Sequence, residues 1–95
     1  MVRGGHAHKI CHQLIIAVVG TFSCKVSNFN ESETLQIDAN GPSLYVPPLT
    51  WIEQYSFSEN CVVAVLASHY YEEEDYIRNF TAFMDLKTNV YRKKP

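Results

Sequence analysis

The fold class of this protein is decided by the stretch HQLIIAVVGTFSCKVSNF, residues 12–29. Its first part, residues 12–19, is apolar and rich in β-branched side chains and ends at a glycine, which is typical of a strand followed by a turn. In residues 21–29, apolar and polar side chains alternate, and this period of two predicts a strand that is buried on one face only. The stretch therefore predicts two consecutive β-strands.

Further short strands are expected downstream of this pair, separated by turn residues. The strongest turn signal is ANGP at residues 39–42. We expect strands at residues 33–38, 43–46, 51–57 and 61–67. A series of this kind is typical of an antiparallel barrel or sandwich. The run at 61–67 is apolar throughout, so we expect a central strand that is covered on both faces.

The composition changes after Ser68, where an acidic segment leads into apolar residues at helical spacing, among them Phe80 and Phe83. We expect a helix from about Asp75 to Lys87 that packs on the sheet, with acidic residues in its first turn. The chain then forms one domain over residues 1–95. Its strands lie in 1–69, its helix within 70–88 and a tail at 89–95.

Composition and charge exclude several function classes. The chain has 95 residues and a formal net charge of -2, and its only basic run is Arg92-Lys93-Lys94 at the end, which we interpret as a solvated tail. A nucleic-acid partner is therefore not expected, because binding to phosphates needs clustered basic residues. No apolar run approaches the roughly 20 residues that span a bilayer. We expect no membrane partner and a cytoplasmic location.

Two histidines near the start of the chain are candidates for chemistry. Residues two apart in an extended segment point to the same face, so His6 and His8 project together and Ala7 faces the other way. Two imidazoles on one face suggest either a metal site or an acid/base pair. The alternative interpretation is a pair of exposed histidines.

The spacing that follows resembles the first cupin motif. Four residues separate His8 from Gln13, and six separate Gln13 from Gly20. In that motif a glutamate ligand usually occupies the position of Gln13.

The second cupin motif is also recognisable, again without its ligand. Gly41 is followed after five residues by Pro47, and Ile52 stands where a histidine is expected. Two imidazoles and a neutral amide are a poor cage for iron, manganese or zinc, which normally take three or four protein ligands. We therefore expect a protein that uses no metal and no other cofactor.

Four further side chains are candidates for substrate binding. Tyr45 and Trp51 could stack on a sugar or a nucleobase, although aromatic residues of a sheet can equally belong to the core. Arg3 could bind a phosphate or a carboxylate. Gln13, if it faces the same pocket as the histidines, can donate a hydrogen bond to an oxyanion.

Most of the chain resembles one family, the dTDP-sugar 3,4-ketoisomerases, which are cupins similar in fold to dTDP-4-dehydrorhamnose epimerases. The matching stretches are RGGHAHK (3–9), LYVPP (44–48) with Trp51, VLAS (65–68) and YYEEEDYIRN (70–79). The resemblance implies an all-β cupin jelly roll, also called a double-stranded β-helix, with a C-terminal α-helix. It also implies a homodimer that exchanges N-terminal strands. Those strands are missing here, so we expect the jelly roll to be incomplete at its N-terminus.

The resemblance also implies an activity. Members move the keto group between C4 and C3 of a dTDP-4-keto-6-deoxyhexose without a metal, in deoxyamino-sugar biosynthesis for surface polysaccharides such as lipopolysaccharide O antigen. His6 and His8 then carry the chemistry, with His8 as the base that acts on carbon and His6 moving the proton between the two sugar oxygens. Alternatives are a nucleotide-sugar epimerase on the same fold and a truncated, non-catalytic sugar-binding cupin.

Overall fold

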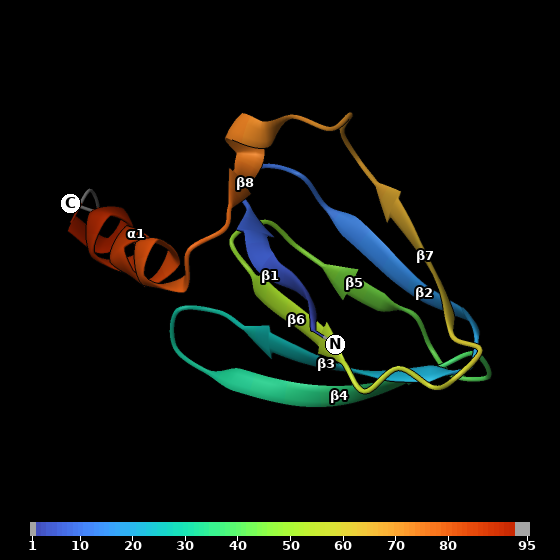
Figure 1. Cartoon of the computed structure of the whole chain (residues 1–95). Helices are drawn as coiled ribbons and strands as arrows, with labels where there is room; N and C mark the ends of the chain where they lie inside the picture. Colours follow the sequence, from blue (N-terminus) through green and yellow to red (C-terminus); the bar gives the residue numbers. More distant parts are fainter. Residues whose placement is uncertain (1, 93–95) are drawn as a thin grey trace.

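The computed structural model describes the backbone of residues 2–92 and the side chains of residues 2–86. The described chain is mostly β-structure followed by one helix (Figure 1). Its elements are β1 (Arg3–His8), β2 (Gln13–Val19), β3 (Thr21–Ser27), β4 (Ser32–Asp38), β5 (Leu44–Val46), β6 (Trp51–Tyr55), β7 (Val62–Ala67), a 3₁₀ turn η1 (Glu73–Asp75), β8 (Tyr76–Ile77) and α1 (Phe80–Arg92). None of the helices in this part of the chain is long and apolar enough to cross a membrane.

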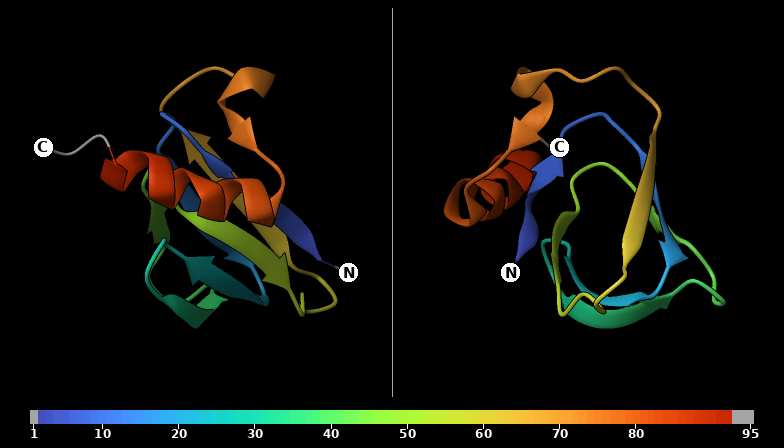
Figure 2. Two further views of the ribbon diagram at one scale, coloured as in Figure 1. Left: turned by 90° about the vertical axis from the view of Figure 1, so that its left-hand side faces the viewer. Right: turned by 45° about the vertical axis from the view of Figure 1, so that its right-hand side comes forward.

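The strands form two antiparallel sheets that face each other. The larger sheet has the order β4-β3-β6-β1-β8, and the smaller has the order β5-β2-β7. Figure 2 shows that the two sheets curve around a common interior and that α1 lies outside it, beside the end of the larger sheet that contains β1 and β8. The expected antiparallel barrel is confirmed, with β2 to β7 within a few residues of the predicted bounds, whereas β1 and β8 were not among the predicted strands.

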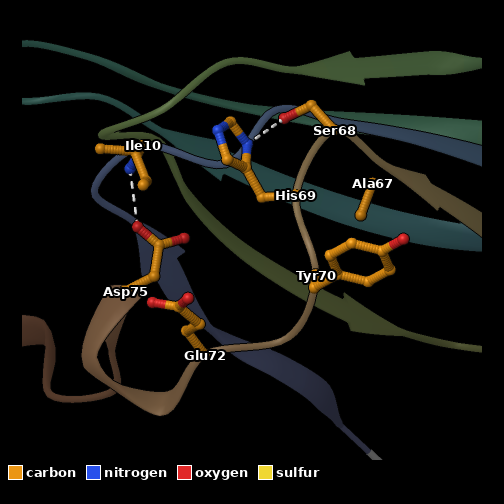
Figure 3. Close-up of a pocket in the computed structure, with 7 residues that line it drawn as sticks. All are labelled: Ile10, Ala67, Ser68, His69, Tyr70, Glu72 and Asp75. Atoms are coloured by element: carbon orange, nitrogen blue, oxygen red, sulfur yellow. Dashed lines mark hydrogen bonds between the residues drawn. The ribbon is translucent and has the colours of Figure 1, made fainter.

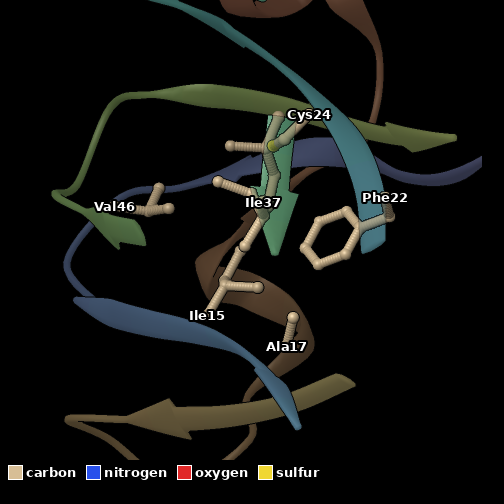
Figure 4. Close-up of a cluster of buried hydrophobic side chains, with 7 residues drawn as sticks. Ile15, Ala17, Phe22, Cys24, Ile37 and Val46 are labelled. Carbon is tan, nitrogen blue, oxygen red and sulfur yellow. The ribbon is translucent and has the colours of Figure 1, made fainter. Parts of the chain in front are cut away.

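The main core fills the space between the two sheets (Figure 4). Alternation places the apolar side chains of each strand inward, as predicted from Phe22 and Cys24 in β3. Burial raises the pKa of the Cys24 thiol to about 11, so it behaves as a small neutral core side chain. The buried members of this core are Ile15, Ala17, Phe22, Cys24, Ile37, Val46 and Ile52.

A second apolar cluster lies on the opposite face of the larger sheet, under α1. Ala7, Trp51, Ile77 and Phe83 are buried in it. Successive residues of a strand face opposite sides, so Trp51 points toward the helix while Ile52 points into the barrel. The prediction that a C-terminal helix packs on the sheet is confirmed.

The start of that helix was predicted wrongly. α1 begins at Phe80, because the Asn79 side chain accepts a hydrogen bond from the Ala82 N–H at 3.0 Å and so caps the helix. Residues 73–75 form a 3₁₀ turn, and Tyr76–Ile77 form a strand paired with β1. The helix continues to Arg92, beyond the predicted start of the tail at 89, and residues 93–95 of that tail lie outside the described residues.

The prediction for β7 was also wrong. This strand pairs with β2 at the edge of the smaller sheet, and it is not covered on both faces. Leu66 is 59% exposed and Val65 is 46% exposed, although Val65 lies opposite the fully buried Ile15. A continuous apolar run indicates that both faces of a strand are apolar, but it does not specify what covers them.

Candidate active site

β1 brings the two predicted histidines together on the barrel side of the larger sheet. The rings of His6 and His8 lie edge to face with centroids 5.1 Å apart, while Ala7 between them is buried under α1. The strand contains a bulge, because Gly4 pairs with Glu53 and the next paired residue is His6, opposite Ile52. The prediction that His6 and His8 share a face is therefore confirmed.

Two glycines make this bulge possible. Gly4 and Gly5 have φ angles of 83° and 64°, a region that side chains with a Cβ rarely adopt. A Cβ on Gly4 would also lie 2.9 Å from the carbonyl oxygen of Ile52. The local sequence GGHAH thus permits a backbone that most other residues at these two positions would strain.

His8 is held by a carboxylate from a distant part of the chain. Its Nδ1 lies 2.8 Å from Oδ2 of Asp75, and both side chains are buried. Asp75 also accepts hydrogen bonds from the backbone N–H groups of Ile10, at 2.7 Å, and Cys11, at 3.3 Å (Figure 3 shows the contact with Ile10). Burial opposes ionisation of Asp75, but the hydrogen bonds from His8 and the two backbone groups outweigh it and hold its pKa below the ordinary value.

Three buried polar atoms near β1 have no hydrogen-bond partner within the described part of the chain. They are Nε2 of His6, Nε2 of His8 and Oε1 of Gln13. Buried polar atoms are nearly always paired, so unpaired ones beside a cavity mark a candidate functional site. The role in substrate binding that the sequence suggested for Gln13 stays a prediction.

A small cavity adjoins two of these three side chains. It has a volume of about 90 Å³, and both His8 and Gln13 line it. A larger pocket of about 540 Å³ lies next to it (Figure 3). The two share the lining residues Ala67, His69, Tyr70, Glu72 and Asp75. The cavity beside His8 therefore borders a larger pocket that has room for a substrate.

The electrostatic environment keeps His6 neutral. Burial lowers the pKa of His6 below 6.5, a hydrogen bond with the Gly4 backbone partly opposes this, and electrostatic interactions with His8 and Arg78 lower the pKa further. A neutral imidazole can accept a proton and can also donate one, which suits it to move a proton between two oxygen atoms.

Tyr76 packs against both histidines. Its ring centroid lies 4.2 Å from that of His8 and 5.2 Å from that of His6. The guanidinium of Arg78 lies over the same tyrosine ring at 4.2 Å and donates two hydrogen bonds to Glu73, at 2.7 and 2.9 Å. Hydrogen bonds from Arg78 and Tyr71 lower the pKa of Glu73 to about 2. These side chains fix the position of the Tyr76 ring.

Sequence reasoning missed Asp75 and Tyr76 as parts of the site. Asp75 was interpreted as the start of a helix, and no local pattern links it to His8, which is 67 residues away. The only signal was the family resemblance of residues 70–79, which include both.

The structure does not bring the other predicted binding residues to this cavity. Arg3 lies at the far end of β1, with its guanidinium 5.5 Å from the centre of the Phe57 ring. Tyr45 is exposed and stacks on His12. Trp51 is buried under α1, and its Nε1 donates a hydrogen bond to Glu53 at 2.9 Å. Their predicted roles in substrate binding stay predictions.

One set of side chains could hold a metal ion. His8, Cys11 and Asp75 offer nitrogen, sulfur and oxygen atoms within 4.8 Å of one another. However, His8 is hydrogen-bonded to Asp75, and the Cys11 thiol donates to the carbonyl of His12 at 3.3 Å. Hydrogen bonding accounts for the cluster without a metal, and the expectation that the protein uses none stays a prediction.

Comparison with known proteins shows which protein family the chain matches. The family model described as "FdtA: WxcM-like, C-terminal" matches residues 1–88. The TDP-4-oxo-6-deoxy-alpha-D-glucose-3,4-oxoisomerase of Aneurinibacillus thermoaerophilus is 40% identical over 81 residues, which are 85% of this chain and 58% of that protein. The chain thus spans little more than half the length of this curated relative.

Solved structures agree with the family match. QdtA, a sugar 3,4-ketoisomerase from Thermoanaerobacterium thermosaccharolyticum in complex with TDP, is 36% identical, with a TM-score of 0.89 over 96% of this chain and 66% of that one. A histidine-to-asparagine variant of the same enzyme, in complex with TDP-4-keto-6-deoxyglucose, gives a TM-score of 0.88 at 36% identity over 94% of this chain and 64% of that one. These likenesses confirm the predicted all-β cupin jelly roll with a C-terminal helix.

Proposed function

The chain belongs to the FdtA family of WxcM-like C-terminal domains, and from that premise we propose that it acts as a 3,4-ketoisomerase on a dTDP-linked 4-keto-6-deoxyhexose. The activity of its relatives supports this proposal. The observation that carries it is the group of unpaired buried atoms, Nε2 of His6, Nε2 of His8 and Oε1 of Gln13. Two neighbouring histidines, one of which lines a cavity, are suited to move protons on a bound sugar.

The reaction needs only proton transfers. The C4 ketone makes the proton on C3 acidic, and Nε2 of His8 removes it to give an enediolate. His6 donates a proton to the oxygen on C4 and takes one from the oxygen on C3. His8 then returns its proton to C4, so the ketone stands on C3 and no net oxidation has occurred. Gln13 lines the same cavity as His8 and hydrogen-bonds one of the sugar oxygens.

The pockets suggest how the substrate enters. The sugar occupies the cavity beside His8, and the rest of the nucleotide sugar extends through the larger pocket that shares Asp75 and His69 with it (Figure 3). The solved complexes of QdtA with TDP and of its variant with TDP-4-keto-6-deoxyglucose support a substrate of this class. A homodimer, a role in making surface polysaccharides and a cytoplasmic location stay predictions.

The test is an assay of the 95-residue protein with dTDP-4-keto-6-deoxyglucose in deuterated water, followed by NMR of the sugar. The proposal predicts a ketone at C3 and deuterium at C4. Washout at C3 with the ketone unmoved would instead indicate an epimerase. A folded protein that gives no exchange would contradict the activity proposed for this chain and favour a non-catalytic domain.

A further inference from the structure

We propose that Asp75 is a positioning residue that fixes His8 in the tautomer with its proton on Nδ1, so that the bare Nε2 is the reacting nitrogen. The role of Nε2 as a base rests on the proposed function. The tautomer itself is a property of the protein and can be measured without any turnover.

The hydrogen bonds around Asp75 decide which atom carries the proton. Oδ1 accepts the N–H of Ile10, and Oδ2 accepts the N–H of Cys11 as well as facing Nδ1 of His8. A carboxylate in this setting is ionised and can only accept. A bare Nδ1 at 2.8 Å would therefore place two lone pairs against each other, whereas a protonated Nδ1 forms a charge-assisted hydrogen bond.

The other nitrogen of His8 has the environment that a base requires. Nε2 is buried and has no hydrogen-bond partner in the described chain, and the ring lines the small cavity. Neutral imidazole has one N–H and one lone pair, so a proton on Nδ1 leaves the lone pair on Nε2. The contacts with His6 and Tyr76 restrict rotation of the ring.

The position of Asp75 is itself fixed by the backbone. Its own carbonyl accepts a hydrogen bond from the N–H of Lys9 at 2.9 Å, and its side chain holds the N–H groups of Ile10 and Cys11. One residue therefore ties the turn before β8 to three of the four residues that connect β1 and β2. The carboxylate has little freedom to leave His8.

The first experiment measures the tautomer directly, by long-range nitrogen–proton NMR of the isotope-labelled 95-residue chain at mildly alkaline pH. We expect the His8 proton on Nδ1. In Asp75→Asn, the amide oxygen can keep the 2.7 Å contact with Ile10, and the NH₂ then faces Nδ1 at the cost of the longer 3.3 Å contact with Cys11, so the proton should move to Nε2. The matched control is Glu74→Gln, an exposed acid in the same turn, which should leave the tautomer unchanged.

Two results would overturn the proposal: a wild-type His8 protonated on Nε2, or an Asp75→Asn protein in which the proton stays on Nδ1. If Asp75→Asn does not fold, the wild-type measurement alone decides the tautomer. The NMR result does not depend on activity. A chain without turnover would refute the proposed function, and the NMR would still decide the tautomer of His8.

The second experiment uses kinetics. If the chain is active, Asp75→Asn should lower kcat about 100-fold or more, with a change in KM of less than about threefold, because binding groups stay in place while the base has the wrong tautomer. Asp75→Glu, which keeps a carboxylate, should retain more activity than Asp75→Asn. A moved tautomer with unchanged kcat would refute the positioning role.

Discussion

The two sheets of this barrel differ in how their strands are covered. In the larger sheet, β1 and β6 are packed on both faces, since Trp51 lies under α1 and Ile52 lies in the barrel core. In the smaller sheet, β7 is an exposed edge with Val65 and Leu66 largely accessible. Catalytic geometry must be held closely, and side chains on rigid, well-packed elements meet that demand best. The candidate histidines lie on the doubly packed strand, and the difference suggests a division between closely packed strands that hold the proposed acid/base residues and an edge strand that tolerates substitution.

The largest expected effect is a loss of turnover when His8, the proposed base on β1, is replaced. His8→Asn should lower turnover by about 10²–10⁴-fold, the usual contribution of a general base, while binding of dTDP measured by calorimetry stays similar. His12→Asn is the matched control, because His12 stacks on the exposed Tyr45 outside the cavity. An active His8→Asn protein would reject the assignment of His8 as the base.

Next in size is the difference in stability between the two sheets. Phe83→Ala removes a fully buried ring from the cluster under α1 and should cost about 3–5 kcal/mol in the free energy of unfolding. Leu66→Ala on β7 should change that free energy by only about 0.5 kcal/mol. Urea denaturation of both variants measures this contrast, and equal losses would contradict the proposed division.

The pH dependence of stability is a smaller effect, and two of the groups that contribute to it lie in the candidate site. The folded pKa of His6 lies below 6.5 and that of Asp75 below 3.8, so the unfolded chain binds more protons than the folded one as the pH falls. Stability should therefore decrease as the pH falls below about 6.5, and decrease again below about 3.8. Thermal midpoints of the wild type, His6→Asn and Asp75→Asn measure this. Each variant should lose the decrease that belongs to its residue, and an unchanged profile in both would contradict the explanation.

The smallest expected effect concerns Arg78, which supports the tyrosine behind the histidines. Arg78→Ala removes an exposed ion pair and a cation–π contact, so the urea midpoint should hardly change. Turnover should fall about two- to fivefold, because the Tyr76 ring loses one of its supports. Lys25→Ala is an exposed control on β3. Turnover equal to that of the control would show that the Tyr76 ring needs no support from Arg78.

The sequence predicted the positions of β2 to β7 along the chain well, because the apolar pattern of a strand is local. It predicted that His6 and His8 share a face, because strand periodicity relates residues that are close in the chain. Gln13 was singled out by its spacing in a motif that resembles the first cupin motif. Gln13 faces inward together with Ile15 in the same strand, as the period of two requires.

The rest of the site depends on tertiary contacts that no local pattern encodes. Asp75 lies in an acidic run that resembles the first turn of a helix, and only the pairing of β8 with β1 brings it to His8. Trp51 could have faced either side of β6, and the position of α1 decided which one. The exposure of β7 could not be predicted either, because an apolar run does not specify which elements cover it.

The bulge in β1 shifts the alternation of inward and outward side chains by one residue. If the strand paired regularly, Gly5 would lie opposite Ile52, and every later side chain would exchange sides. Ala7 would then point into the barrel, and both histidines would point toward α1. Gly4 and Gly5 therefore determine on which face of the sheet each later side chain of β1 lies. That face decides which residues of the segment GGHAH can reach a substrate.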